Sequence, residues 1–174
     1  MSGRSSCGLA GAALALSLLS PGEALAQVAI GADASAVHGG TNAAWGFGID
    51  GRFGYRTGFP RAWIVHSIIV QAEAIGGIRQ LLAQPDDLDI KTLGGGVRIG
   101  GALSWFQPFV FAHFNAANAL GDWGYLVDFG GALDWRLRTL SVGVQYAHDW
   151  LHIAPGLQQF NEFGVHIEVR GFWL

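Results

Sequence analysis

The stretch "FGGALDWRLRTLSVGVQYAHDW", residues 129–150, decides the fold class of this chain. Large apolar side chains occupy most alternate positions on both sides of a break near Arg138 and Thr139, and small or polar residues lie between them. Because successive side chains of a strand point to opposite faces, this pattern predicts two antiparallel strands joined by a tight turn. The alternation leaves open which face meets water, since the apolar side could form a soluble core or a lipid-facing surface.

The same alternation recurs along the chain and predicts eight strands, with residues 129–150 forming the sixth and seventh. The other expected strands cover residues 28–37, 45–55, 62–75, 95–103, 109–117 and 163–173. Their connections are expected to be short and long in turn, and residues 79–92 form the most prominent long one. This rhythm is typical of a barrel with tight turns at one rim and loops at the other.

The composition favours a membrane barrel over a soluble sandwich. The chain is 51% hydrophobic and only 13% charged, against about 25% charged residues in ordinary soluble domains. Of its ten lysines and arginines only Lys91 is a lysine, although water-facing sheet edges usually carry lysine to prevent pairing. The net charge of −3 and the absence of a basic cluster in the sequence indicate no nucleic-acid partner.

The first 26 residues have the pattern of a secretory signal peptide. Arg4 precedes an apolar run at residues 9–19, which is too short to span a bilayer, and Ala24 and Ala26 have the small-residue spacing of a cleavage site. The sequence therefore predicts a cleaved signal at residues 1–26 and a single barrel domain at residues 27–174.

The seven tryptophans indicate which side of the strands faces lipid. All of them fall at or near predicted strand ends, where the indole rings of membrane barrels gather at the two membrane–water interfaces. The girdle predicted at the short-turn rim contains Trp63, Trp105, Trp135 and Trp173, and the girdle at the long-loop rim contains Trp45, Trp123 and Trp150. The alternate strand positions that carry large apolar side chains are therefore expected to face lipid.

The strand positions between the large apolar side chains carry a mixture of glycines and charged residues, as a narrow eight-stranded lumen requires. The predicted lumen residues are Asp50, Arg52, Arg56, Glu73, Arg98, His113, Asp128, Asp134, Arg136, Asp149, His166, Glu168 and Arg170. Six acids against five arginines predict a nearly neutral, salt-bridged interior. His113 and His166 could meet across the lumen, and hydrogen bonds to these acids are expected there rather than a metal or cofactor site.

Three segments carry a family resemblance: "PFVFAHF" at residues 108–114, "GGALDWRL" at 130–137 with "LSVGVQYAHDWLH" at 140–152, and "FGVHIEVRGFWL" at 163–174. They resemble the fifth strand, the penultimate hairpin and the last strand of small bacterial outer-membrane barrels of the OmpA/OmpX type. The resemblance implies an all-β fold, an eight-stranded antiparallel up-and-down transmembrane β-barrel in the cell outer membrane. It also implies lipid bilayer and lipopolysaccharide as surroundings, and recognition of the last strand by the barrel-assembly machinery.

The expected function is a structural or surface-contact role, with a lumen plugged by its charges and loops displayed outward. Two alternatives remain open: a narrow small-solute channel, because lumen glycines leave space, and a soluble secreted lipocalin-like barrel. No enzymatic activity is expected, because the adjacent His66 and Ser67 point to opposite faces of a strand. The sequence indicates no particular surface partner.

Overall fold

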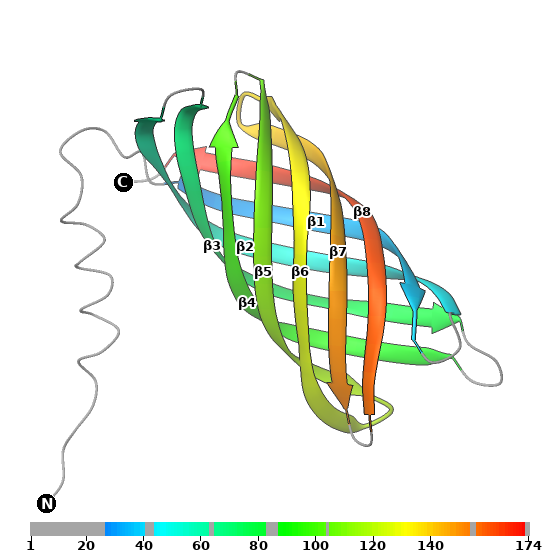
Figure 1. The fold of residues 1–174 in the computed structure, drawn as a ribbon. Coiled ribbons are helices and arrows are strands. Elements are labelled where there is room, and N and C mark those ends of the chain that lie inside the picture. The colour runs from blue at the N-terminus through cyan, green and yellow to red at the C-terminus, as the bar shows by residue number, and fades with distance from the viewer. Residues whose placement is uncertain are drawn as a thin grey trace, which may run out of the picture.

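The computed structural model describes residues 27–172 apart from residues 41–43, 63–64, 83–86, 104 and 154–155. The described residues form a closed barrel of eight antiparallel strands in chain order (Figure 1). The described part of the chain contains no helix with the length and apolar character needed to cross a membrane. The signal peptide predicted at residues 1–26 lies outside the described residues.

The strands confirm the predicted number and order, and each is longer than predicted. They are β1 (Gln27–Gly39), β2 (Ala44–Ala62), β3 (Val65–Leu82), β4 (Leu88–Ala102), β5 (Phe106–Ala119), β6 (Asp122–Leu137), β7 (Leu140–Ile153) and β8 (Gly156–Phe172). We call the rim where β1 begins and β8 ends the terminal rim (upper left in Figure 1), and the opposite rim the distal rim.

The long connections predicted from the sequence are wrong, because the strands continue through most of them. Only two to five residues separate successive strands. In the predicted connection at residues 79–92, β3 runs on to Leu82 and β4 begins at Leu88. The alternation is lost there because outward positions near the distal rim carry polar residues, such as Gln80 and Lys91, so both faces of these strands contain polar side chains.

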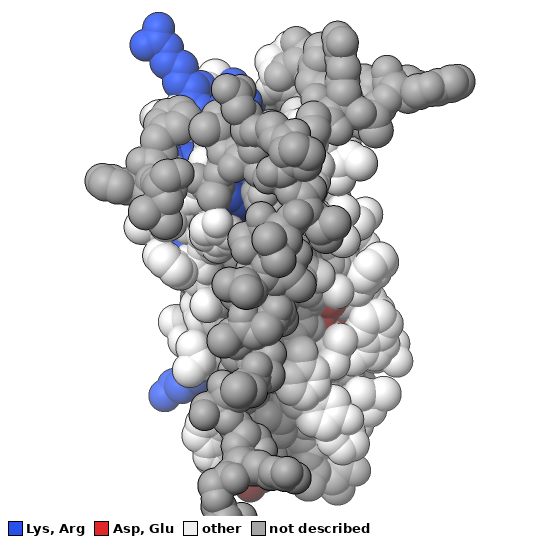
Figure 2. Space-filling view, turned by 90° about the vertical axis from the view of Figure 1, so that its left-hand side faces the viewer, with Lys and Arg blue, Asp and Glu red and all other residues white. Residues whose placement is uncertain are grey.

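The barrel places apolar residues outside and charged residues inside. Outward side chains such as Ile99, Val110 and Phe129 are about half exposed, whereas Arg98 and Asp134 in the interior are 1% exposed. Figure 2 shows one face of the molecule, on which most of the described residues are uncharged. A soluble lipocalin-like barrel would need the reverse arrangement, because an apolar surface of this extent needs a non-aqueous surrounding.

Large lumen side chains lie opposite glycines on neighbouring strands. Asp50 faces Gly77 across β2 and β3, and His113 faces Gly96 across β4 and β5. A Cβ atom on Gly77 would lie 2.0 Å from Asp50 Oδ1, and one on Gly96 would lie 2.5 Å from His113 Cδ2. Neighbouring side chains and backbone therefore fill the space next to these glycines. This weakens the expectation that lumen glycines leave room for a channel.

Replacement of Gly77 by alanine is expected to lower the free energy of unfolding by about 1–3 kcal/mol, as overpacking of a tight interior does. The added Cβ would also meet the Ile49 carbonyl oxygen at 2.4 Å. The matched control is Gly51→Ala on the outer face, where the nearest atom would be 3.9 Å away. Urea unfolding of the barrel in lipid vesicles measures both, and equal effects would contradict the packing argument.

Candidate functional site: the charged lumen

The distal end of the lumen is closed by apolar side chains, which we call the apolar cap. It consists of Val37, Leu81, Ile90, Ala117, Ala119, Leu126, Leu151 and Phe160, all at most 4% exposed. These residues lie near the distal ends of seven strands, on the parity that faces the interior. The sequence did not predict this cap, because interior positions were expected to be polar throughout.

Below the apolar cap lies an acidic layer organised by Arg79, which we call the Arg79 cluster. Arg79 Nε lies 2.8 Å from Glu162 Oε2 and 3.5 Å from Asp149 Oδ2, and its Nη1 lies 3.4 Å from Asp50 Oδ1. All four side chains are buried. One guanidinium therefore provides the nearest positive charge for three carboxylates in a water-poor interior.

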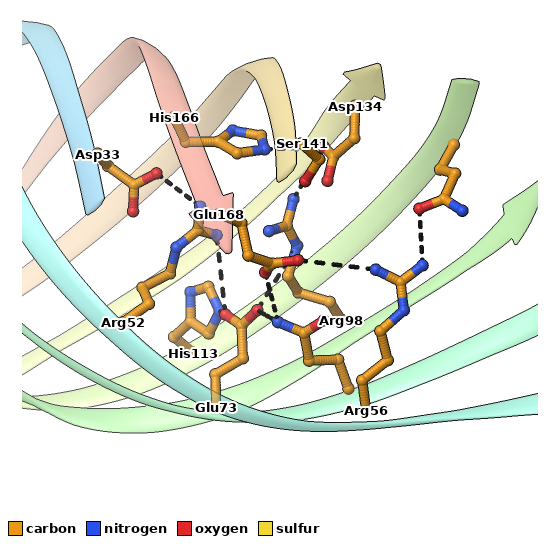
Figure 3. A network of polar contacts seen from close by, with 12 residues as sticks. Asp33, Arg52, Arg56, Glu73, Arg98, His113, Asp134, Ser141, His166 and Glu168 are labelled. Carbon is orange, nitrogen blue, oxygen red and sulfur yellow. Dashed lines mark hydrogen bonds and ion pairs between the residues drawn. The ribbon is translucent and has the colours of Figure 1, made fainter. Parts of the chain in front are cut away.

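The centre of the lumen is a network around Glu73 (Figure 3). His113 Nε2 lies 3.1 Å from Glu73 Oε2, and its Nδ1 bonds to Asp128. Arg98 Nε and Arg52 Nη1 lie 3.7 and 3.9 Å from the Glu73 carboxylate. These contacts join side chains from β2, β3, β4, β5 and β6 across the barrel axis.

Toward the terminal rim the network continues through Glu168 (Figure 3). Arg170 Nε donates to Glu168 Oε1 at 2.8 Å, and Gln71 Nε2 donates to Glu168 Oε2 at 2.9 Å. Arg56 Nη1 lies 3.7 Å from Glu168 Oε1, and its Nη2 donates to Gln107 Oε1 at 2.6 Å. This layer lies in the lumen between the network around Glu73 and the terminal rim.

Asp134 links the arginines to the second lumen histidine. Its Oδ1 lies 3.5 Å from Arg98 Nη2 and its Oδ2 lies 3.7 Å from Arg170 Nη2. His166 Nε2 lies 2.9 Å from Asp134 Oδ1, close enough for an ion pair but without the alignment of a hydrogen bond. His113 and His166 thus contact different carboxylates, and the described residues contain no cluster of three or more groups suited to a metal ion.

Twelve of the thirteen predicted lumen residues are buried in the barrel, and Arg136 is not. Arg136 is exposed at the end of β6, where its backbone nitrogen donates to the Trp105 carbonyl oxygen. It has the interior parity, but it lies too close to the terminal rim to be covered. The prediction for Arg136 is therefore wrong.

Three buried charges were missed by sequence reasoning: Asp33, Arg79 and Glu162. Arg79 and Glu162 fell in stretches assigned to connections, and Asp33 lay in the weakly patterned first strand, where it pairs with Arg52 Nη2 at 2.6 Å. The described interior therefore holds eight buried carboxylates against five buried arginines. The predicted near-neutral balance is wrong, and two of the three excess acids lie in the Arg79 cluster.

Two buried phenylalanines, Phe109 and Phe111, pack against lumen arginines. The guanidinium carbon of Arg98 lies 4.8 Å from the ring centre of Phe109 and 5.8 Å from that of Phe111. Arg56 approaches Phe109 from another strand, at 5.4 Å. A cavity of about 20 Å³ remains beside His113 and Arg79, and this is room for about one water molecule.

The five described tryptophans lie near the two rims. Trp45, Trp123 and Trp150 are near the distal rim, and Trp105 and Trp135 are near the terminal rim. Trp45, Trp105 and Trp123 are at least 60% exposed, and the other two are half-buried. The remaining two predicted girdle residues, Trp63 and Trp173, lie outside the described residues.

No protein-family model matches the chain, and no curated protein sequence matches it. Among solved structures, Neisserial surface protein A superposes with a TM-score of 0.62 at 12% identity, covering 82% of this chain and 96% of that one. The outer membrane enzyme PagL gives a TM-score of 0.46 at 16% identity, covering 79% of this chain and 98% of that one. The N-terminal β-barrel domain of Pseudomonas aeruginosa OprF gives 0.45 at 9% identity, covering 80% and 96%.

Proposed function

Because the chain has the fold of the small eight-stranded outer-membrane β-barrels, we propose that it is an integral protein of the bacterial outer membrane with a lumen closed by its own side chains. The role is structural, with contacts to other molecules made from the outside of the barrel. The observation that carries the proposal is the succession of buried polar groups along the lumen: the layer with Arg56 and Glu168, the network around Glu73 and the Arg79 cluster.

The apolar exterior supports a membrane location. On β8 the outward side chains Val165, Ile167 and Val169 are each about half exposed and follow one another along the strand. Similar runs occur on the neighbouring strands, and together they form a belt that hydrocarbon can cover. With the predicted signal peptide removed, the terminal rim faces the periplasm and the distal rim faces outward, among lipopolysaccharide. Assembly by the barrel-assembly machinery belongs to the same proposal.

The filled lumen favours a plug over a narrow channel. Arg98, one of the largest lumen side chains, is 1% exposed and lies between Glu73, Asp134 and Phe109. An eight-stranded barrel has an interior just wide enough for its own side chains. The apolar cap adds a barrier to ions at the distal end, because an ion would lose its hydration there.

The short connections change where surface contacts are made. The four connections at the distal rim contain two to five residues each, so they offer little loop surface to a partner. The surface-contact role therefore belongs to the distal rim itself and to the outer faces of the strands that reach it.

The absence of enzymatic activity remains part of the proposal. The histidines His113 and His148 bond to carboxylate or amide oxygens, and His38 contacts the Ala44 carbonyl oxygen. Nucleophilic catalysis by serine would need one of these imidazoles within hydrogen-bond reach of a hydroxyl. Their observed partners support a binding or structural role instead.

The refolded chain, without residues 1–26, is expected to give no steady conductance in a planar bilayer. Arg52→Ala and Asp134→Ala are expected to give channel openings, because each removes a charged member of the lumen network and leaves one partner, Asp33 or His166, without its contact. Arg136→Ala is the matched control: it removes an exposed arginine at the rim and is expected to stay silent. Steady conductance of the unmodified barrel would contradict the plug.

A further inference from the structure

Near the distal rim, the outer faces of β7, β8 and β1 carry polar side chains. Farther from that rim, the outer faces of the same strands are apolar. His148 and His152 on β7, Asn161 on β8 and His38 on β1 all have the outward parity. These three strands are neighbours in the closed barrel (Figure 1). Asn161 is exposed, and His148 and His38 are half-exposed.

These polar groups are organised by hydrogen bonds and register. Asn161 lies opposite His148 on β7 and opposite His38 on β1, so the three residues form one row across the sheet. Tyr146 Oη donates to Asn161 Oδ1 at 2.8 Å, and His148 Nδ1 lies 2.9 Å from the same oxygen. These two hydrogen bonds use Oδ1 of Asn161 and Nδ1 of His148, so Asn161 Nδ2 and His148 Nε2 can bind a ligand.

Aromatic rings border the row. The His38 ring stacks on Trp45 with 4.3 Å between ring centres, and Trp45 is 63% exposed. The His148 ring meets Trp150 edge to face at 4.6 Å. We call this surface the polar strip, and it consists of His38, Trp45, Tyr146, His148, Trp150 and Asn161.

The position of the polar strip indicates the depth at which it lies in a membrane. Amide and imidazole groups facing hydrocarbon would lack partners, at a cost of several kcal/mol each. The strip therefore lies at the headgroup level of the outer leaflet, directly above the apolar belt formed by residues such as Phe163 and Val165 on β8. A lipid held there would have its headgroup on the strip and its chains along the belt.

The chemistry of the polar strip fits a sugar better than a phosphate. The strip contains no lysine or arginine, which are the side chains that usually pair with phosphate. It offers planar hydrogen-bonding groups beside exposed aromatic faces, and these match the hydroxyls and apolar faces of a saccharide ring. On the basis of the proposed membrane location, we propose that the polar strip binds the sugar headgroup of a glycolipid in the outer leaflet.

The test is native mass spectrometry of the refolded chain, without residues 1–26, in detergent with rough-type lipopolysaccharide, phosphatidylglycerol or phosphatidylcholine. Lipopolysaccharide is expected to remain bound, whereas the two phospholipids, one anionic and one neutral, dissociate. Asn161→Leu and His148→Leu are each expected to weaken binding about tenfold, as the loss of one or two hydrogen bonds to a ligand does. Gln80→Leu, at an outward position of β3 near the distal rim, is expected to leave binding unchanged.

Two results would overturn the inference. Equal retention of phosphatidylglycerol would show that charge rather than sugar is recognised, and equally tight binding of the deacylated, soluble saccharide would show that no lipid is needed. Near-ultraviolet circular dichroism checks that each variant has folded, and Asn161→Gln provides a milder substitution if the leucine variant fails. If the chain does not insert into phosphatidylcholine vesicles at all, the membrane location itself fails. If the chain inserts but shows no preference for the glycolipid, the proposed glycolipid site fails and the proposed membrane location stands.

Discussion

Replacement of Arg79 by methionine is expected to lower the free energy of unfolding by about 3–5 kcal/mol, the cost of removing one partner from a buried ion pair. Methionine fills much of the volume of the arginine side chain but leaves Asp50, Asp149 and Glu162 without their nearest positive charge. Asp149 adds to the expected loss of stability, because its carboxylate is 0% exposed and neither oxygen accepts a hydrogen bond among the described residues. The measurement is urea unfolding in lipid vesicles, followed by tryptophan fluorescence.

The second substitution Glu162→Gln, added to Arg79→Met, separates charge from packing. It removes one of the uncompensated carboxylates, so the double variant is expected to be more stable than Arg79→Met alone. Lys91→Met serves as the control for loss of a positive charge at an exposed position, and its effect is expected to stay within about 0.5 kcal/mol. A loss of less than about 1 kcal/mol for Arg79→Met would show that the Arg79 cluster is not held by its charges.

An arginine in place of Ile167 is expected to cost about 2–4 kcal/mol, because it places a charge at the middle of the apolar belt. Ile167 is 47% exposed on the outside of β8, between Val165 and Val169. Its side chain makes no part of the lumen network, so the cost arises from the surrounding lipid rather than from packing. The same unfolding measurement in vesicles determines it.

Gln159→Arg is the matched control for depth in the membrane. Gln159 lies on the same strand with the same outward parity, near the distal rim, where an arginine is expected to cost only about 0–1 kcal/mol. Equal costs at the two positions would mean that the belt around Ile167 does not lie in hydrocarbon. The proposed membrane location would then need to be abandoned.

Alternation predicted the strands well where the two faces differ in chemistry. Along residues 129–150 the two faces differ almost throughout, and these residues form most of β6 and β7. The prediction failed near the distal rim, where β3 carries Gln80 outward and Leu81 inward, the reverse of the pattern lower down the same strand. Because outward polar residues and the inward apolar cap reverse the usual contrast at that depth, alternation alone could not extend the strands to their true ends.

Parity also predicted which face a charge lies on, but not how far along the barrel it lies. Arg136 and Arg98 share the interior parity of their strands, yet Arg136 is exposed at the rim and Arg98 is fully buried. Depth depends on strand tilt and on where each strand ends, and these are set by pairing between distant residues. Arg79 was missed for the same reason, because its place in the interior depends on the true end of β3.

The short connections have a consequence for how the chain folds. Among the described residues, seven of the eight strand pairs join neighbours in sequence across two to five intervening residues, so closing each of them costs little chain entropy. Only the pairing of β1 with β8, which brings Gln27 opposite Phe172, joins distant parts of the chain. The other strand pairs therefore join residues that are close in sequence. We expect the pairing of β1 with β8, which joins residues far apart in sequence, to be the slowest step of folding.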